Sequence, residues 1–467
     1  MDKTGLQSLL TCVADYAAAR RDDDAGRPHS PQASYADMVR AFDLPLDGAP
    51  VATVIDELIA RAEPGLAAMT GPRFFGWVIG GSHEAGLAAD WLTGLWGQNA
   101  GNHLGCPAAS AAEETAGRAL LDLMDLPRQA SVGFVTGATM ANFTCLLAAR
   151  GEVLRRAGWD ADGDGLFGAP PIHVVMGEEA HSTVFAALKY AGLGYRRVIR
   201  VATDANGAML PEAFEAAMAP LDGLVIVIAQ AGHINSGAFD PFPRIIAAAR
   251  ARNAWVHVDG AFGLWARAAK DRAHLAVGLE GADSWAVDGH KWLQTPYDCG
   301  YAIVRDQKAH HRAMQIAASY LPGADDDDRN PSDYVPELSR RARGFATWAM
   351  IRHLGRDGVS SMVSRHCALA RRFAERLSAE PDIAILNDVV LNQVAVRLGS
   401  DLDPAEADRL TKAAIARIQS DGVCFVGGAQ WQGAWIIRIS VIGMTTTEAD
   451  VEKSADAITA AWRAVKG

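Results

Sequence analysis

Apolar runs alternate with amphipathic segments through the middle of the chain, between Ser131 and Val304. The runs recur roughly every 25 to 30 residues, and apolar residues in the segments between them lie three and four positions apart, as in helices. The runs are IHVVM, RVIRV, GLVIVIA, AWVHV, SWAV and GYAIV, which begin at Ile172, Arg197, Gly223, Ala254, Ser284 and Gly300. This alternation predicts an α/β fold with right-handed crossovers and a mostly parallel sheet, whose ligands bind beyond the carboxyl ends of the strands.

The two ends of the chain have other patterns. The segment VATVIDELIARAEPGLAAM has helical spacing, and we expect an N-terminal helical arm over residues 1–85 with little core of its own. After residue 345, helix candidates are interspersed with the apolar runs IAILND, LNQVAVRL, GVCFVGG and AWIIRISV. This mixture predicts a smaller α+β domain over residues 346–467, and the large domain then spans 86–345.

Composition and charge favour a globular enzyme that acts on small molecules. The chain is 467 residues long, and its formal charge of −11 gives no basic surface for nucleic acid or anionic lipid. The longest aliphatic run, LVIVIA, is too short to cross a membrane, and MDKTGLQSLL does not resemble a secretory signal. Six cysteines without CxxC or metal spacing indicate reduced thiols and no metal site. We therefore expect a cytoplasmic protein.

Lys291 lies in SWAVDGHKWLQTPYDCGYAIV, between two apolar strand candidates. Burial disfavours the ammonium form of a lysine, so the free amine becomes available to attack a carbonyl carbon. The alternative is a lysine that extends its ammonium group to water. The residues upstream decide between these interpretations.

Two polar segments upstream precede helix candidates at the same predicted sheet edge. In VTGATMANFTCLLAAR a strand ends at Val135 and Thr139 opens a helix, whose backbone N–H groups can bind an anion such as phosphate. In VMGEEAHSTVFAAL, His181 follows a strand, so its imidazole can stack on a flat cofactor ring. Each segment also has an ordinary interpretation, because Thr139 and His181 can simply cap their helices.

Asp259 ends the apolar run AWVHV, and a buried carboxylate there needs a cationic or hydrogen-bonding partner. A protonated pyridine nitrogen would meet this need, as would backbone amides or an arginine. Together, the anion site, His181, Asp259 and Lys291 describe a pyridoxal-phosphate site. The phosphate would lie at the helix start, the ring nitrogen at Asp259 and the aldehyde on Lys291 as a Schiff base.

The segments TGATMAN, EEAHSTV, HVDGAFG and DGHKWLQTPYDCG resemble successive motifs of the group II pyridoxal-phosphate-dependent decarboxylases. This family includes aromatic L-amino acid decarboxylase and glutamate decarboxylase. The resemblance implies the fold type I architecture of aspartate aminotransferase, with a mostly parallel seven-stranded sheet in the large domain and a smaller C-terminal α+β domain. It also implies a homodimer with active sites at the subunit interface.

The matching positions imply specific roles. Lys291 would form the Schiff base, Asp259 would hold the pyridine nitrogen and His181 would stack on the ring. The resemblance also implies further cofactor contacts. The phosphate would be bound by Ala138, Thr139 and His290, and Ala261 would lie against the ring. Ser339 would contact the phosphate in the neighbouring subunit.

Tyr320, in SYLPGADDDDRNPSDY, matches the family tyrosine that protonates the quinonoid carbon after carbon dioxide leaves. Relatives that form aldehydes usually carry phenylalanine there, so the tyrosine favours simple decarboxylation to an amine. A water-exposed loop tyrosine is the alternative, since four aspartates follow closely.

The substrate pocket is less constrained by the resemblance. Phe74, Trp77 and Val78 predict an apolar wall, which favours an aromatic L-amino acid. His233 and Asn235 stand where aromatic decarboxylases carry a threonine-rich stretch, and they are candidate substrate contacts. Another pyridoxal-phosphate lyase, an aldolase or an aldehyde-forming decarboxylase is the alternative, because only the orientation of the broken bond separates these reactions.

Overall fold

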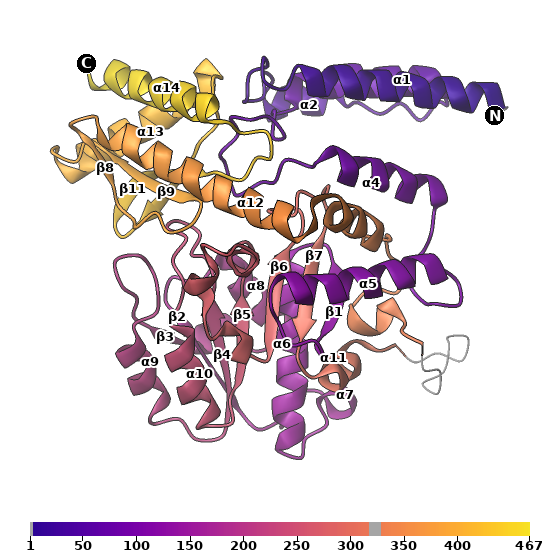
Figure 1. The fold of residues 1–467 in the computed structure, drawn as a ribbon, viewed down its shortest axis with the longest axis vertical. Helices are drawn as coiled ribbons and strands as arrows, with labels where there is room; N and C mark the ends of the chain where they lie inside the picture. Colours follow the sequence, from indigo (N-terminus) through magenta and orange to yellow (C-terminus); the bar gives the residue numbers. More distant parts are fainter. Residues whose placement is uncertain (1–2, 317–327) are drawn as a thin grey trace. The chain divides into compact units, whose positions relative to one another are not determined.

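The computed structural model describes residues 3–316 and 328–467 (Figure 1). The chain forms two compact units. The sheet unit consists of residues 80–371 and 387–394, and the terminal unit consists of residues 1–79, 372–386 and 395–467. Both ends of the chain therefore belong to one unit, and the strands predicted between Ser131 and Val304 belong to the other.

The sheet unit contains a seven-stranded sheet in the order β1-β7-β6-β5-β4-β2-β3. The strands are β1 (Ser131–Val135), β2 (Ile172–Gly177), β3 (Ile199–Val201), β4 (Leu224–Gln230), β5 (Trp255–Asp259), β6 (Ser284–Asp288) and β7 (Gly300–Val304). Strand β7 is antiparallel to β1 and β6, whereas β3, β2, β4, β5 and β6 pair in parallel. The predicted mostly parallel sheet and the fold type I architecture are confirmed.

The sheet unit also contains α-helices that lie before, between or after its strands along the chain (Figure 1). They are α4 (Glu84–Trp96), α5 (Pro107–Leu123), α6 (Ala138–Arg156), α7 (Ala161–Asp164), α8 (Ser182–Tyr190), α9 (Pro211–Met218), α10 (Phe242–Arg250) and α11 (Gln307–Met314). The long helix α12 (Gly344–Ser378) begins in the sheet unit and ends in the terminal unit. Gly355 interrupts α12 with a φ of 60°, a value that glycine adopts at little cost.

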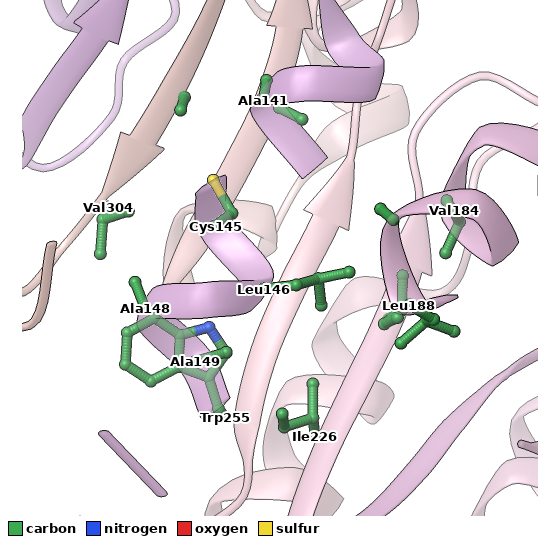
Figure 2. Close-up of a cluster of buried hydrophobic side chains, with 14 of the residues drawn as sticks. Ala141, Cys145, Leu146, Ala148, Ala149, Val184, Leu188, Ile226, Trp255 and Val304 are labelled. Carbon is green, nitrogen blue, oxygen red and sulfur yellow. The ribbon is translucent and has the colours of Figure 1, made fainter. Parts of the chain in front are cut away.

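Helix α6 packs closely on the sheet because its buried face carries small side chains (Figure 2). These are Ala141, Cys145, Ala148 and Ala149, and all are fully buried. Leu146 lies on the same helix and belongs to the same core cluster as Val184 and Leu188 of α8. The helix that starts at the predicted anion site is thus fixed along most of its length by apolar packing.

A buried ion pair joins α5 to the segment before α12. Arg340 and Glu113 each have side chains that are 1% exposed, and Arg340 Nη1 lies 2.8 Å from Glu113 Oε1. The same guanidinium donates to the carbonyl oxygens of Ala100, at 2.8 Å, and of Phe134, at 2.6 Å. Arg340 therefore connects β1 with two peripheral segments.

The variant Arg340→Met is expected to lower the free energy of unfolding by about 3–5 kcal/mol, because it leaves the Glu113 carboxylate buried without its cation. Urea unfolding followed by circular dichroism measures the change. The matched control is Arg118→Met on α5, whose partner Glu114 forms an exposed pair that contributes about 0–1 kcal/mol. Equal stability losses in the two variants would contradict a structural role for the buried pair.

The terminal unit combines helices with a four-stranded sheet in the order β10-β11-β9-β8. Its helices are α1 (Lys3–Asp22), α2 (Tyr35–Ala41), α3 (Val51–Ala62), α13 (Pro404–Asp421) and α14 (Glu448–Lys466). The strands are β8 (Ile383–Ile385), β9 (Gln393–Leu398), β10 (Gly427–Trp431) and β11 (Ala434–Ser440).

The apolar run GVCFVGG does not form the strand expected from its sequence, because β10 begins only at Gly427. Phe425 instead stacks on Phe74 with ring centroids 4.6 Å apart, and its backbone bonds to Arg73 and Phe75. The run is thus buried by this aromatic contact and by an isolated parallel bridge between Phe425 and Phe74, outside the four-stranded sheet.

Among the described residues, no helix combines the length and apolar character that crossing a bilayer requires.

Candidate active site

The predicted site residues gather at one edge of the sheet. Asp259 ends β5 and lies opposite Gln230 of β4 and Ala286 of β6. Lys291 follows Asp288, the last residue of β6, by three positions. The amide of Asp288 donates to the carbonyl of Ala261 at 2.9 Å, which joins the loops after β5 and β6. Neighbouring parallel strands thus bring the acid and the amine to the same edge.

The Lys291 side chain is mostly buried, with 16% of its surface exposed. Its Nζ lies 2.7 Å from Oδ2 of Asp288, whose side chain is only 3% exposed. The ring of Phe262 lies beside the amine, with its centroid 5.8 Å from Nζ. The amine is therefore held by one carboxylate in a sparsely hydrated place.

Glycine and glutamine hold the backbone turn that carries Lys291. A Cβ atom at Gly80 would lie 2.3 Å from the carbonyl oxygens of both His290 and Lys291, so only glycine fits there. Gln294 donates through Nε2 to the Lys291 carbonyl at 3.1 Å and accepts from the Gly81 amide at 2.6 Å. Gly80 and Gly81 thus pack against this turn and help to fix its backbone.

The variant Gly80→Ala is expected to lower turnover by about 100-fold, because its methyl group must displace the backbone of Lys291 and a shift near 1 Å misaligns the reacting groups. Steady-state kinetics with saturating cofactor measures the loss. The matched control is Gly151→Ala on α6, where no atom lies within 4 Å of the added Cβ. Full activity of Gly80→Ala would show that the turn tolerates displacement.

Asp288 is a site residue that the sequence analysis missed. Its Oδ1 accepts from the Ala138 amide at 2.5 Å and lies 3.5 Å from His290 Nε2, while Oδ2 bonds to Lys291. The signal was present, because Asp288 is a carboxylate at the end of an apolar strand, as Asp259 is.

His290 is buried beside Lys291, and its ring stacks on Tyr297 with centroids 4.2 Å apart. Its Nδ1 accepts a hydrogen bond from the Cys299 amide at 3.2 Å. Burial lowers the pKa of His290, although the nearby Asp288 carboxylate opposes this shift. The neutral imidazole therefore carries its proton on Nε2, which can donate to an anion.

The start of α6 provides backbone donors at the same edge. Gly137 precedes the helix without a side-chain cap, and Ala138 is buried whereas Thr139 is exposed. Within residues 3–316 and 328–467, the amides of Thr139 and Met140 have no hydrogen-bond acceptor. With the Thr139 hydroxyl, these amides form a place for a phosphate group.

A buried histidine ties α6 to the strand that ends at Asp259. His257 Nε2 lies 2.8 Å from Asn142 Oδ1 on α6, and Nδ1 lies 2.9 Å from Ser284 Oγ on β6. Burial lowers the pKa of His257 to about 3, so the imidazole stays neutral. The anion site and Asp259 are thus held in one rigid frame.

Asp259 itself is 4% exposed, and its Oδ1 accepts from the Ala261 amide at 3.2 Å. It lines a small cavity with Gly177 at the end of β2 and Gly207. His181 begins α8 shortly after β2, where Nδ1 lies 2.7 Å from Thr183 Oγ1. His181 therefore caps α8. It also follows β2 at the sheet edge, as the sequence suggested.

His233 and Asn235 lie in the loop after β4, and both are buried. His233 Nε2 lies 3.1 Å from Glu179 Oε2, and Nδ1 lies 3.2 Å from Ser236 Oγ. Within the described ranges, the side-chain oxygen of Asn235 has no hydrogen-bond partner. Of the two predicted substrate contacts, His233 is engaged in bonds within the protein.

The remaining predicted residues belong to other segments of the chain. Phe74, Trp77 and Val78 belong to the terminal unit, where Trp77 packs on Phe425 with centroids 5.0 Å apart. Ser339 is exposed and lines a surface depression of the sheet unit beside Arg340. Tyr320 lies outside the described residues.

The donors at this edge fit the cofactor expected from the sequence. A partly buried amine suits an aldehyde, a buried carboxylate suits a protonated ring nitrogen, and unpaired helix amides suit a phosphate. Lys291, Asp259 and Thr139 supply these three groups from separate segments of the sheet unit.

Comparison with known proteins gives matches along most of the chain. The family profile "Pyridoxal-dependent decarboxylase conserved domain" matches residues 38–399. Phenylacetaldehyde synthase of Arabidopsis thaliana is 26% identical over 418 residues, which cover 86% of this chain and 84% of that protein. L-2,4-diaminobutyrate decarboxylase of Rhizobium meliloti (strain 1021) is 29% identical over 379 residues, which cover 80% and 74% of the two chains.

A solved structure also matches the whole fold. The crystal structure of Oryza sativa TDC with PLP and tryptamine has a TM-score of 0.92 and 22% sequence identity, and the match covers 100% of this chain and 99% of that chain. The likeness extends to every layer of the architecture.

Proposed function

The chain belongs to the pyridoxal-dependent decarboxylase family, and from this premise we propose that it removes carbon dioxide from an L-amino acid at Lys291 and releases the amine. Membership of this family makes the chain a pyridoxal-phosphate-dependent decarboxylase of group II. The observation that supports the location most strongly is the meeting of Lys291, Asp259 and the α6 amides at one sheet edge.

In the proposed mechanism, each of these residues has one task. Pyridoxal phosphate, when bound, supplies a protonated ring that accepts the electron pair left at Cα when carbon dioxide departs. Lys291 would hold the aldehyde through its amine and would later release it to the substrate amine. Asp259 would keep the proton on the ring nitrogen, and His181 and Ala261 would contact the ring. Thr139, Ala138 and His290 would hold the phosphate, and this anchoring would determine which substrate bond is aligned for cleavage.

We propose an aromatic L-amino acid as the substrate. Similarity to tryptophan decarboxylase 2 of Oryza sativa subsp. japonica, at 25% identity over 432 residues, supports this choice. The similarity to a diaminobutyrate decarboxylase makes a basic substrate the main competitor. Incubating the purified protein with each common L-amino acid and with L-2,4-diaminobutyrate, and measuring carbon dioxide and amine, tests both. Consumption of substrate without carbon dioxide would rule out decarboxylation.

Tyr320 is proposed to protonate Cα. Tyr320→Phe is therefore expected to release carbon dioxide while the product shifts from amine toward aldehyde and ammonia, as water is consumed and dioxygen is reduced to hydrogen peroxide. The similarity to phenylacetaldehyde synthase supports the view that aldehyde formation can occur on the same fold. Quantifying amine, aldehyde and ammonia from one reaction measures the partition. An unchanged amine yield would remove Tyr320 from the mechanism.

A homodimer with Ser339 reaching the neighbouring active site is part of the proposal. Helix α4 lines the depression that contains Ser339 through Thr93 and Gly94, and it exposes the apolar side chains of Trp91, Leu92, Leu95 and Trp96. Exposed apolar clusters of this kind mark protein interfaces. Sedimentation equilibrium of the full chain tests the dimer, and a monomer at micromolar concentration would contradict it.

We also infer a cytoplasmic location. The six cysteines are unpaired, and five of them are buried, which suits a reducing compartment.

A further inference from the structure

The Asp288 carboxylate lies between two groups that the proposed cofactor site requires. One oxygen accepts from the Ala138 amide at the start of α6, at 2.5 Å, and the other lies 2.7 Å from Lys291 Nζ. With 3% of its side chain exposed, this carboxylate is poorly screened by water. A buried negative charge therefore stands beside the place where a phosphate group is to bind.

Lys291 is the cation that offsets this charge. Among the described residues, no other lysine or arginine lies within 4.0 Å of the Asp288 carboxylate. His290 Nε2 is 3.5 Å away, but burial lowers the pKa of His290 and favours its neutral form. Asp298, which acts on His290 as well, has its own partner in Arg343 at 3.0 Å. Among the described residues, Lys291 and Asp288 therefore offset each other's charge.

Cofactor binding at Lys291 disturbs this pair. Bonding of the amine to an aldehyde would replace the Lys291 ammonium with a less basic imine nitrogen that has fewer N–H donors, which weakens the ion pair, while the phosphate would add negative charge at the start of α6. A buried carboxylate that loses its cation and gains an anionic neighbour opposes binding. The disturbed ion pair opposes any aldehyde that bonds to Lys291, whereas the added negative charge opposes only an aldehyde that carries a phosphate, so this second contribution distinguishes the two ligands.

We propose that Asp288 is a specificity-determining residue that weakens the binding of the phosphorylated cofactor and keeps the cofactor exchangeable. The proposal rests on the proposed location of the cofactor at Lys291. In the protein without cofactor, Asp288 occupies the Ala138 amide and holds the Lys291 ammonium, and in this way it stabilises the empty site.

The backbone of Asp288 is held independently of its side chain. Its amide donates to the Ala261 carbonyl at 2.9 Å, and its carbonyl accepts from Trp265 Nε1 at 2.9 Å. Asparagine has nearly the same shape, and its side-chain oxygen can still accept from the Ala138 amide. Asp288→Asn therefore removes the charge while retaining the fold and one hydrogen bond.

The experiment compares two ligands that differ only in the phosphate. Full-length protein stripped of cofactor is titrated with pyridoxal phosphate and with pyridoxal, and the dissociation constants are measured by absorbance and tryptophan fluorescence. Asp288→Asn is expected to bind pyridoxal phosphate at least about tenfold more tightly, with a clearly smaller gain for pyridoxal, because only the phosphate adds negative charge beside residue 288. Inorganic phosphate is also expected to compete with the cofactor more effectively in this variant.

Asp164→Asn, an exposed position on α7, removes the same charge far from the Lys291 pair and is expected to change neither constant. Equal changes for the two ligands, or weaker binding of pyridoxal phosphate by Asp288→Asn, would overturn the proposal. Asp288→Ser provides a second uncharged variant, and it must change the two dissociation constants in the same direction as Asp288→Asn. Urea unfolding of each variant verifies the fold.

Failure of the site assignment has a different signature. Borohydride reduction of the loaded wild-type protein followed by peptide mapping identifies the lysine that carries the cofactor. Attachment to another lysine would refute the location at Lys291, whereas attachment to Lys291 with unaltered phosphate selectivity in Asp288→Asn would refute the role of Asp288 alone.

Discussion

Lys291→Ala is expected to abolish the covalent attachment of pyridoxal phosphate and to lower the rate of decarboxylation by at least about 1,000-fold, because the variant lacks the amine that binds the aldehyde and releases the product. Borohydride reduction followed by mass spectrometry measures the attachment, and single-turnover release of carbon dioxide measures the chemical step. Noncovalent cofactor binding should persist, since the α6 amides and Asp259 remain.

The matched control is Lys308→Ala on α11, which removes an exposed lysine of the same unit. It should retain both attachment and turnover. A Lys291→Ala protein that still fixes the cofactor after reduction would show that another lysine carries the chemistry.

Asp259→Ala is expected to weaken cofactor binding and to lower turnover by about 100-fold to 10,000-fold, because the ring nitrogen loses the carboxylate that keeps it protonated. Asp259→Asn should retain much of the cofactor binding but lose most of the turnover, since a neutral amide does not stabilise the protonated ring. Comparing the dissociation constant of the cofactor with turnover at saturating cofactor separates the two effects.

Asp222→Asn, at an exposed position before β4, is the control for loss of one acidic charge from the sheet unit. Turnover near the wild-type level in Asp259→Asn would contradict the ring-nitrogen role. Equal loss of cofactor binding and turnover in both Asp259 variants would instead indicate that Asp259 only supports the shape of the site.

The proposals on Asp259 and Asp288 concern two carboxylates with opposite consequences. Each ends a parallel strand, and each is almost fully buried. Asp259 has no cation within the described residues, so a protonated ring would offset its charge, whereas Asp288 already has Lys291. Similar local sequence thus produces one acid that attracts the cofactor and one that opposes its phosphate.

The strands of the sheet unit could be predicted because burial on both faces requires continuous apolar runs, which are visible along the chain. The same runs located Lys291 and Asp259, since both polar residues interrupt the apolar pattern at strand ends. GVCFVGG shows where this reasoning fails, because an apolar run can be buried by Phe74 as well as by a neighbouring strand.

The sequence by itself determined the order of the strands along the chain and the chemical groups at their ends, because these depend on local hydrophobicity and residue type. Only the tertiary structure decided which groups touch. Gly80 and Gln294 support the turn of Lys291 from segments that are remote in sequence, and the Asp288 carboxylate bridges Lys291 to the start of α6. Such contacts arise from the packing of distant segments, which no local pattern encodes.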